Sequence, residues 1–148
     1  MIVVFVRHGA PRNNESDPEL TSFGHRMSIE TGQWLKNKGW VPSVCFSTKT
    51  RRTFQTAENL LLGCQVSLVI NPFDMAEDVQ VLDPIHALLT ENLFAKVALV
   101  CCHQPLLEHL RLQYAPHGPP IRFATAFIMR YSEGQWICID TWAGRVSY

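Results

Sequence analysis

Two histidines follow apolar runs that have the pattern of buried strands. His8 comes after residues 2–6 and Arg7, and His103 comes shortly after residues 97–101. Apolar runs without polar interruption are typical of strands covered on both faces of a parallel sheet. The carboxyl ends of such strands lie at one edge of the sheet, where α/β proteins bind their ligands. We therefore expect both histidines at one site.

Arginines accompany these histidines. Arg7 precedes His8, and Arg51 and Arg52 stand in the first turn of a predicted helix, close to Lys49. Cations there oppose the helix dipole at a cost of roughly 0.3–1 kcal/mol each, whereas a bound anion would reverse the sign. We expect Lys49 and one of the two arginines to face solvent, and the other arginine to face the site.

This set of donors fits a phosphoryl group better than a metal ion, because arginine cannot be a metal ligand and its charge would repel the ion. A histidine in such a cluster can attack phosphorus, since nearby cations disfavour its protonated form. Gly9 allows the backbone to approach a ligand closely. Neither a G-x-S-x-G motif nor a P-loop is present, which argues against a serine hydrolase and a P-loop nucleotide site.

Strand and helix patterns alternate along the chain, which indicates a layered α/β fold. Strands are predicted over 2–6, 43–46, 65–70 and 97–101, helices over 22–38, 49–62, 79–92 and 105–113, and a hairpin over 121–131 and 135–142. The length of 148 residues predicts one domain over 1–148.

The composition of the chain limits the classes of binding partner that are expected. Thirteen basic and thirteen acidic residues cancel, which argues against general attraction to nucleic acid or to a membrane surface. No apolar run approaches the roughly 20 residues of a membrane span, and no signal-peptide pattern is visible, so a cytoplasmic location is expected. The five cysteines lack paired spacing, which favours buried free thiols over a zinc site. A monomer is compatible with the sequence, which does not determine the oligomeric state.

Four motifs, in this order, resemble those of the histidine phosphatase, or phosphoglycerate mutase-like, superfamily. They are Arg7-His8-Gly9, L-T-S-F-G at 20–24, S-T-K-T-R-R-T-F-Q-T-A at 47–57 and Cys102-His103. The resemblance spans residues 1–103. It implies a three-layer α/β/α sandwich with a mostly parallel central sheet, and a metal-independent phosphatase without a cofactor.

The resemblance also implies roles. His8 would be the nucleophile that is transiently phosphorylated, Arg7 would hold phosphoryl oxygens, and His103 would stabilise the transferring group. Asn14, next to Asn13, falls where many members have an asparagine that contacts phosphate.

The second phosphate clamp has two candidates. Register against Gln55, three residues downstream, selects Arg52. Arg51 is the alternative, because the match before it is looser and Lys49 stands where proline is common in the family.

Within the superfamily, the small size and the short 10–20 loop resemble the SixA-type phosphohistidine phosphatases. The segment 123–126 followed by a plain hairpin is similar too. The resemblance implies dephosphorylation of phosphohistidine in a signalling protein, and the lack of long insertions argues against mutase activity.

The proton donor is left open. Ala10 stands where many members carry glutamate, and the loop after the third strand offers Asp74, Glu77 and Asp78. These are either general-acid candidates, Glu77 and Asp78 foremost, or solvated loop carboxylates. Imidazole leaves more easily than alkoxide, so a phosphohistidine substrate needs an acid less. A phosphatase for small phosphate esters and a non-catalytic domain that binds phosphoproteins are the alternatives.

Overall fold

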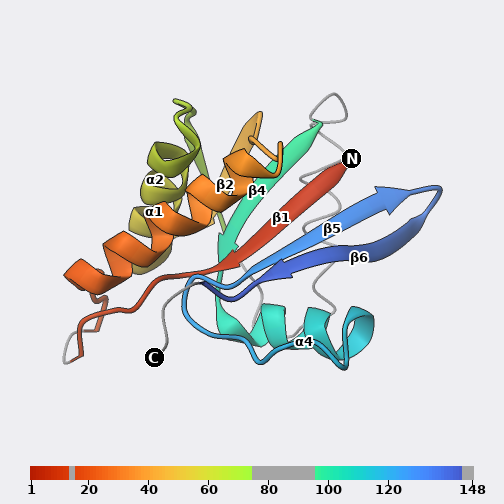
Figure 1. Ribbon diagram of the computed structural model, residues 1–148. Coiled ribbons are helices and arrows are strands. Elements are labelled where there is room, and N and C mark those ends of the chain that lie inside the picture. Colours follow the sequence, from red (N-terminus) through yellow and green to blue (C-terminus); the bar gives the residue numbers. More distant parts are fainter. Residues whose placement is uncertain (14–15, 75–95, 145–148) are drawn as a thin grey trace.

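The structure, a computed structural model, describes residues 1–13, 16–74 and 96–144 (Figure 1). Its elements are β1 (Ile2–Arg7), α1 (Ser22–Asn37), β2 (Val44–Thr48), α2 (Arg51–Cys64), β3 (Ile70–Phe73), β4 (Val97–Cys102), α4 (Gln104–Tyr114), β5 (Ala126–Ser132) and β6 (Gln135–Trp142). The helix predicted over 79–92 lies outside the described residues. No helix in the described ranges is long and apolar enough to cross a membrane.

The described strands form one sheet in the order β3-β2-β4-β1-β5-β6. The first four are parallel to one another, and β5 and β6 add an antiparallel edge. Helices α1 and α2 lie on one face of the sheet and α4 lies on the other (Figure 1). The predicted α/β/α sandwich with a mostly parallel sheet is therefore confirmed.

Strand β1 shows how the layers are joined. Successive side chains of a strand point to opposite faces. Phe5 packs with Leu106 in the apolar cluster on the α4 side, and Val4 packs with Leu35 and Leu60 on the side of α1 and α2. Because β1 and β4 are covered on both faces, their ends are held firmly where the polar residues begin.

Two predicted boundaries differ from the structure. The strand expected over 65–70 is β3, which starts at Ile70 and contains Pro72. Because β3 is at the edge of the sheet, a proline without an N–H is tolerated there. The first hairpin strand begins at Ala126 rather than at residue 121, because Arg122 and Thr125 close a turn in which the Arg122 N–H donates to Thr125 Oγ1 at 2.9 Å.

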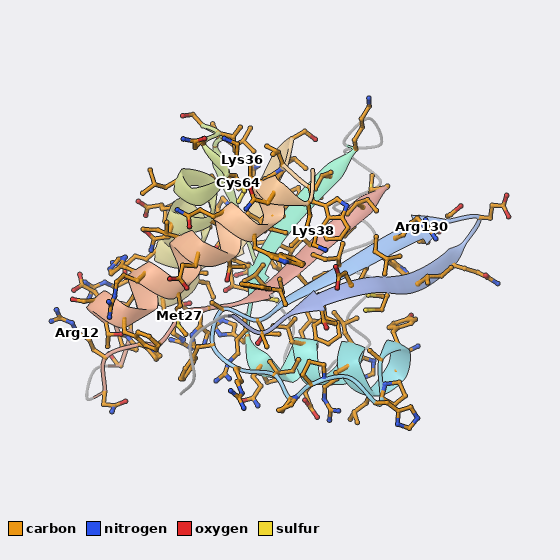
Figure 2. All side chains as sticks on the ribbon, in the orientation of Figure 1. Arg12, Met27, Lys36, Lys38, Cys64 and Arg130 are labelled. Atoms are coloured by element: carbon orange, nitrogen blue, oxygen red, sulfur yellow. The ribbon has the colours of Figure 1, made fainter. Side chains whose placement is uncertain are left out.

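The cysteines are free thiols, as predicted: Cys45, Cys64, Cys101 and Cys102 are buried and Cys138 is half-buried. The Cys64 thiol donates to Gly32 O at 3.2 Å, and burial raises the Cys64 pKa to about 11. Figure 2 shows Cys64 beside Lys36, where the C-terminal ends of α1 and α2 meet. Burial among helices and strands keeps this thiol protonated and unreactive.

Candidate active site

The ends of β1 and β4 bring the two histidines together. The strands are adjacent and parallel, with Arg7 opposite Cys102, so His8 and His103 follow directly at the same edge of the sheet. Their ring centroids lie 5.6 Å apart and the rings meet edge to face, at 65°. His8 and His103 therefore lie together at one edge of the sheet, as the two apolar runs predicted.

The His8 ring has a defined tautomer. Its Nδ1 lies 2.8 Å from Gly9 O, and a carbonyl can only accept, so Nδ1 carries the hydrogen. The backbone is also bonded on both sides, since His8 N donates to Cys102 O and Ala124 N donates to His8 O, each at 3.1 Å. Because Nδ1 carries the hydrogen, the lone pair of the neutral ring is on Nε2.

Burial keeps His8 neutral. The residue is only 7% exposed. Burial lowers the pKa of His8 to about 4, and the charges of Arg52, Arg7 and His103 act in the same direction against the hydrogen bond to Gly9, which raises it. A neutral imidazole with a lone pair on Nε2 is a nucleophile near neutral pH.

Gly9 is held from two sides. Its N–H donates to Thr56 Oγ1 at 2.9 Å, and the same hydroxyl donates to Arg52 O at 2.6 Å. A Cβ added at Gly9 would lie 2.7 Å from Gly24 O, so only glycine fits without a backbone shift. Thr56 therefore connects the end of β1 to the helix that carries Arg52.

The L-T-S-F-G motif at residues 20–24 has a structural role. Thr21 caps α1 by accepting from Gly24 N at 2.9 Å, and its hydroxyl donates to Ala10 O at 3.0 Å. Gln55 Oε1 accepts from Leu20 N at 2.8 Å. These residues do not reach the histidines; they fasten α1 and α2 to the segment that follows β1.

The two neighbouring arginines of α2 face different ways. Arg52 Nη2 lies 3.5 Å from His103 Nδ1, and its charge lowers the pKa of both histidines. Arg51 pairs instead with Glu19, and its backbone N–H donates to Asp17 Oδ1 at 3.0 Å. The structure thus brings Arg52, and not Arg51, to the histidines.

Carboxylates also resolve the unfavourable charge at this helix start. Asp17 lies at the N-terminus of α2, where a negative charge is stabilising. Lys49 pairs with Asp74 at 3.1 Å, and both side chains are exposed. The cations that seemed misplaced are therefore balanced locally, apart from Arg52, which faces the site.

Arg7 reaches the site beneath an aromatic ring. Its Nη1 donates to Ile121 O at 3.4 Å, and its guanidinium carbon lies 4.2 Å from the centroid of the Phe123 ring. The same ring lies 5.8 Å from His8. The sequence marked Phe123 only as part of a resembling segment, because nothing local in the chain shows that it covers Arg7.

The turn that presents Phe123 contains a strained residue. Ala124 has a φ of 55°, in the left-handed region, which is uncommon for a residue other than glycine. Its carbonyl accepts from Thr31 Oγ1 at 3.0 Å, and its N–H donates to His8 O. Strain of this kind is retained where the surroundings impose it, often at functional sites.

His103 is half-buried at the start of α4. Its Nε2 lies 3.1 Å from Thr48 Oγ1 on the neighbouring strand β2. Burial lowers its pKa, and Arg52 and Arg7 lower it further. Thr48 was not predicted as a neighbour of His103, because 55 residues separate them in the chain.

Other predicted site residues have different outcomes. Asn14, Glu77 and Asp78 lie outside the described residues, so their placement stays a prediction. Asp74 is exposed and pairs with Lys49. No group of three histidine, cysteine or acidic side chains in the described ranges could hold a metal ion.

Comparison with known proteins gives matches to a family and to solved structures. A model of the histidine phosphatase superfamily (branch 1) matches residues 3–73. No curated protein matches the sequence. The structure of the protein histidine phosphatase SixA complexed with tungstate is similar, with a TM-score of 0.82 and 20% identity over 97% of each chain.

Two further structures share this fold. A putative phosphohistidine phosphatase SixA from Agrobacterium tumefaciens has a TM-score of 0.75 and 18% identity, over 96% of this chain and 97% of that chain. A mutant phosphoserine phosphatase from Entamoeba histolytica, in complex with phosphoserine, has a TM-score of 0.69 and 12% identity over 95% of each chain. The family model ends with β3, and the solved structures extend the same fold over nearly the whole length. Residues 3–73 thus match the histidine phosphatase superfamily, and the chain as a whole has the phosphoglycerate mutase-like fold of these solved structures.

Proposed function

We propose that this protein is a metal-independent phosphatase that acts through a phosphohistidine intermediate on His8, and that its substrate is phosphohistidine in a protein. One observation carries the proposal: His8 Nε2 holds a free lone pair because Nδ1–H is bonded to Gly9 O. The ring is buried beside the charges of Arg7 and Arg52. A neutral nucleophile next to fixed cations suits attack on a phosphoryl group.

The reaction has two displacements at phosphorus. His8 Nε2 forms a bond to phosphorus while the bond to the substrate's leaving group breaks, and the leaving group takes a proton from solvent, which the hydrolysis step returns. Water then attacks phospho-His8, releasing inorganic phosphate and restoring neutral His8. Arg7 and Arg52 offset the negative charge of the phosphoryl oxygens in both steps, and His103 adds a further contact.

The leaving group is the basis for the substrate class. No carboxylate among the described residues contributes to the pKa shift of His8 or His103. An imidazole leaves without strong acid assistance, whereas an alkoxide gains roughly 10²–10⁴ in rate from a proton donor. Phosphohistidine is therefore the favoured substrate, and the partner is a phosphorylated protein.

A phosphatase for small phosphate esters is the second candidate. The shared fold with a phosphoserine phosphatase favours it, since one fold can serve both leaving groups. It would use Glu77 or Asp78 as the acid. A domain that only binds phosphoproteins is less well supported, because binding alone does not require a buried histidine with its lone pair kept available.

The test compares a phosphohistidine protein, a phosphohistidine peptide and small phosphate esters, each with and without EDTA. We expect turnover of the phosphohistidine substrates to be unchanged by EDTA and lost in His8→Ala. Arg52→Ala should lower kcat/KM by about 100- to 1,000-fold, as for loss of a donor that stabilises transition-state charge. The matched control Arg51→Ala should change kcat/KM by less than about threefold, because Arg51 is in a surface pair.

Each element of the proposal has its own contrary result. Full activity in His8→Ala would contradict the role of His8 as nucleophile. Loss of activity in EDTA would contradict metal independence. An ester turned over far faster than phosphohistidine would replace the substrate class while leaving the chemistry intact. Equal losses of kcat/KM in Arg52→Ala and Arg51→Ala would contradict the role of Arg52 in stabilising the phosphoryl group.

A further inference from the structure

We propose that Thr48 and Thr53 fix the tautomer of His103, so that His103 must take up a proton at Nδ1 when a phosphoryl group binds. This inference rests on the proposed phosphoryl site and assigns two positioning residues to it. Neither threonine touches the phosphoryl group; both act through His103.

A chain of hydroxyl groups runs from His103 to the start of α2. His103 Nε2 lies 3.1 Å from Thr48 Oγ1, which lies 2.8 Å from Thr53 Oγ1. Thr53 Oγ1 lies 3.0 Å from the carbonyl oxygens of Thr48 and of Thr50, and 2.7 Å from Thr50 Oγ1. Thr53 is fully buried and Thr48 is 4% exposed, so water does not compete for these bonds.

The carbonyl oxygens set the direction of the chain. They can only accept, so the single hydrogen of the Thr53 hydroxyl goes to one of them, and Thr50 donates its own hydroxyl hydrogen to Thr53 Oγ1. Thr53 then accepts the hydrogen of Thr48, and the Thr48 oxygen is left to accept from His103. Neutral His103 therefore carries its hydrogen on Nε2 and has its lone pair on Nδ1.

The Nδ1 atom faces Arg52 and lies 3.5 Å from Arg52 Nη2. As a lone pair it cannot donate to a phosphoryl oxygen; it can do so only after it gains a proton. Among residues 1–13, 16–74 and 96–144, the charged groups that act on His103 are Arg52 from α2 and Arg7 from β1, beside the neutral His8, while Glu108 of its own helix pairs with Arg111. The free protein thus holds His103 neutral.

A bound phosphoryl dianion changes this balance. Its charges offset those of Arg7 and Arg52, and an oxygen near Nδ1 favours a hydrogen there. His103 then becomes an imidazolium that donates from Nε2 to Thr48 and from Nδ1 to the ligand. Binding is coupled to uptake of one proton from solvent, so the affinity weakens as pH rises.

Nitrogen NMR tests the tautomer in the wild-type protein without ligand. At about pH 8, where an unperturbed histidine is neutral, the ¹⁵N shifts of His103 should show a protonated Nε2 and an unprotonated Nδ1. In Thr53→Val, which removes the acceptor while keeping the shape, Thr48 can donate to Nε2 and the hydrogen should move to Nδ1. Thr53→Ser should restore the wild-type pattern.

Binding of tungstate, a tetrahedral dianion at this pH, tests the proton uptake. Calorimetry in buffers of different ionisation enthalpy should give close to one proton taken up per tungstate, and an affinity that falls by up to about tenfold per pH unit. His8→Ala should keep the uptake, and His103→Gln should lose it. Thr53→Val should bind with much less uptake and a flatter pH dependence, and Thr53→Ser should restore both.

The outcomes separate this inference from the proposed function. An Nδ1–H tautomer in the free wild-type protein, or tungstate binding without proton uptake, overturns the inference alone. Failure of tungstate to bind overturns both. If tautomer and uptake are as expected but no phosphorylated substrate is turned over, the phosphatase proposal fails and the inference holds. The wild-type measurements decide these cases even where Thr53→Val does not fold.

Discussion

The ends of β1 and β4 each present a histidine, but the two are held by different parts of the chain. The end of β1 is fixed by the backbone: His8 Nδ1 bonds to Gly9 O, and His8 N and O bond to Cys102 and Ala124. The end of β4 is fixed by side chains, since the His103 ring bonds to Thr48 Oγ1 and has Arg52 on its other nitrogen.

This difference means that side-chain substitutions should affect the two histidine tautomers unequally. Backbone groups are present whatever the side chains are, so the tautomer of His8 is protected against most substitutions. The tautomer of His103 depends on hydroxyl groups that a single substitution can remove. We infer that the tautomer of His8 is built into the fold, whereas that of His103 can be changed by substitution without moving His8.

The largest effect should come from breaking the end of β1. In Gly9→Ala the new Cβ would lie 2.7 Å from Gly24 O, a backbone atom that cannot move aside. We expect a loss of about 3 kcal/mol or more in the free energy of unfolding, measured by urea denaturation, together with loss of activity. Gly39→Ala is the control: Gly39 has a φ of 79° but open space around it, and should cost only about 1 kcal/mol. Similar costs at both positions would contradict the close contact.

The dependence of stability on pH should distinguish the two histidines. The folded pKa of His8 is about 4, against an ordinary 6.5, so between these values the unfolded state binds more protons. Stability is therefore fully present above about pH 6.5 and falls as pH drops toward 4, by roughly 3 kcal/mol in total from this group.

The measurement is the free energy of unfolding between about pH 4 and 7 in wild type, His8→Gln and His103→Gln. His8→Gln should remove most of the slope. His103→Gln should remove less, because His103 is half-buried and its pKa is lowered in the same direction from a more exposed position. A larger change in slope for His103→Gln would reverse the ranking of the two sites.

The smallest effect concerns the strained turn that bonds to His8 O. Ala124 has a φ of 55°, which glycine adopts without steric cost. Ala124→Gly should raise the free energy of unfolding by up to about 1 kcal/mol, as measured by thermal and urea denaturation. The same change at Ala57, buried inside α2, should lower it by about 1 kcal/mol. Destabilisation of equal size at both alanines would show that the turn is not strained.

Much of the fold could be predicted because its signals are local in the chain. The apolar runs that became β1 and β4 are continuous in the sequence, and Thr21 and Thr50 are caps placed directly before α1 and α2. The third strand was misplaced because Pro72 is a breaker in most strands but is allowed at an edge. Whether a strand lies at an edge depends on the whole sheet.

The candidate site was predictable only in part. Two apolar runs that end in polar residues were enough to bring His8, His103 and Arg7 to one edge of the sheet. Asn14 and the carboxylates Glu77 and Asp78 stay predictions, since they lie outside the described residues. Phe123 and the threonines beside His103 were missed, because a contact across the fold leaves no mark on local spacing.

By itself, the sequence determined the resemblance to the histidine phosphatase superfamily, the layered α/β architecture and the meeting of the two histidines, since strand patterns and motif order are properties of neighbouring residues. Register favoured Arg52 over Arg51, but only the tertiary structure shows that Arg52 lies beside His103 while Arg51 pairs with Glu19. Asp17 and Glu19, which draw Arg51 away, lie 34 and 32 residues from it in the chain. Long-range partners decide where a charged side chain points, because its energy depends on the charges that the fold brings near it.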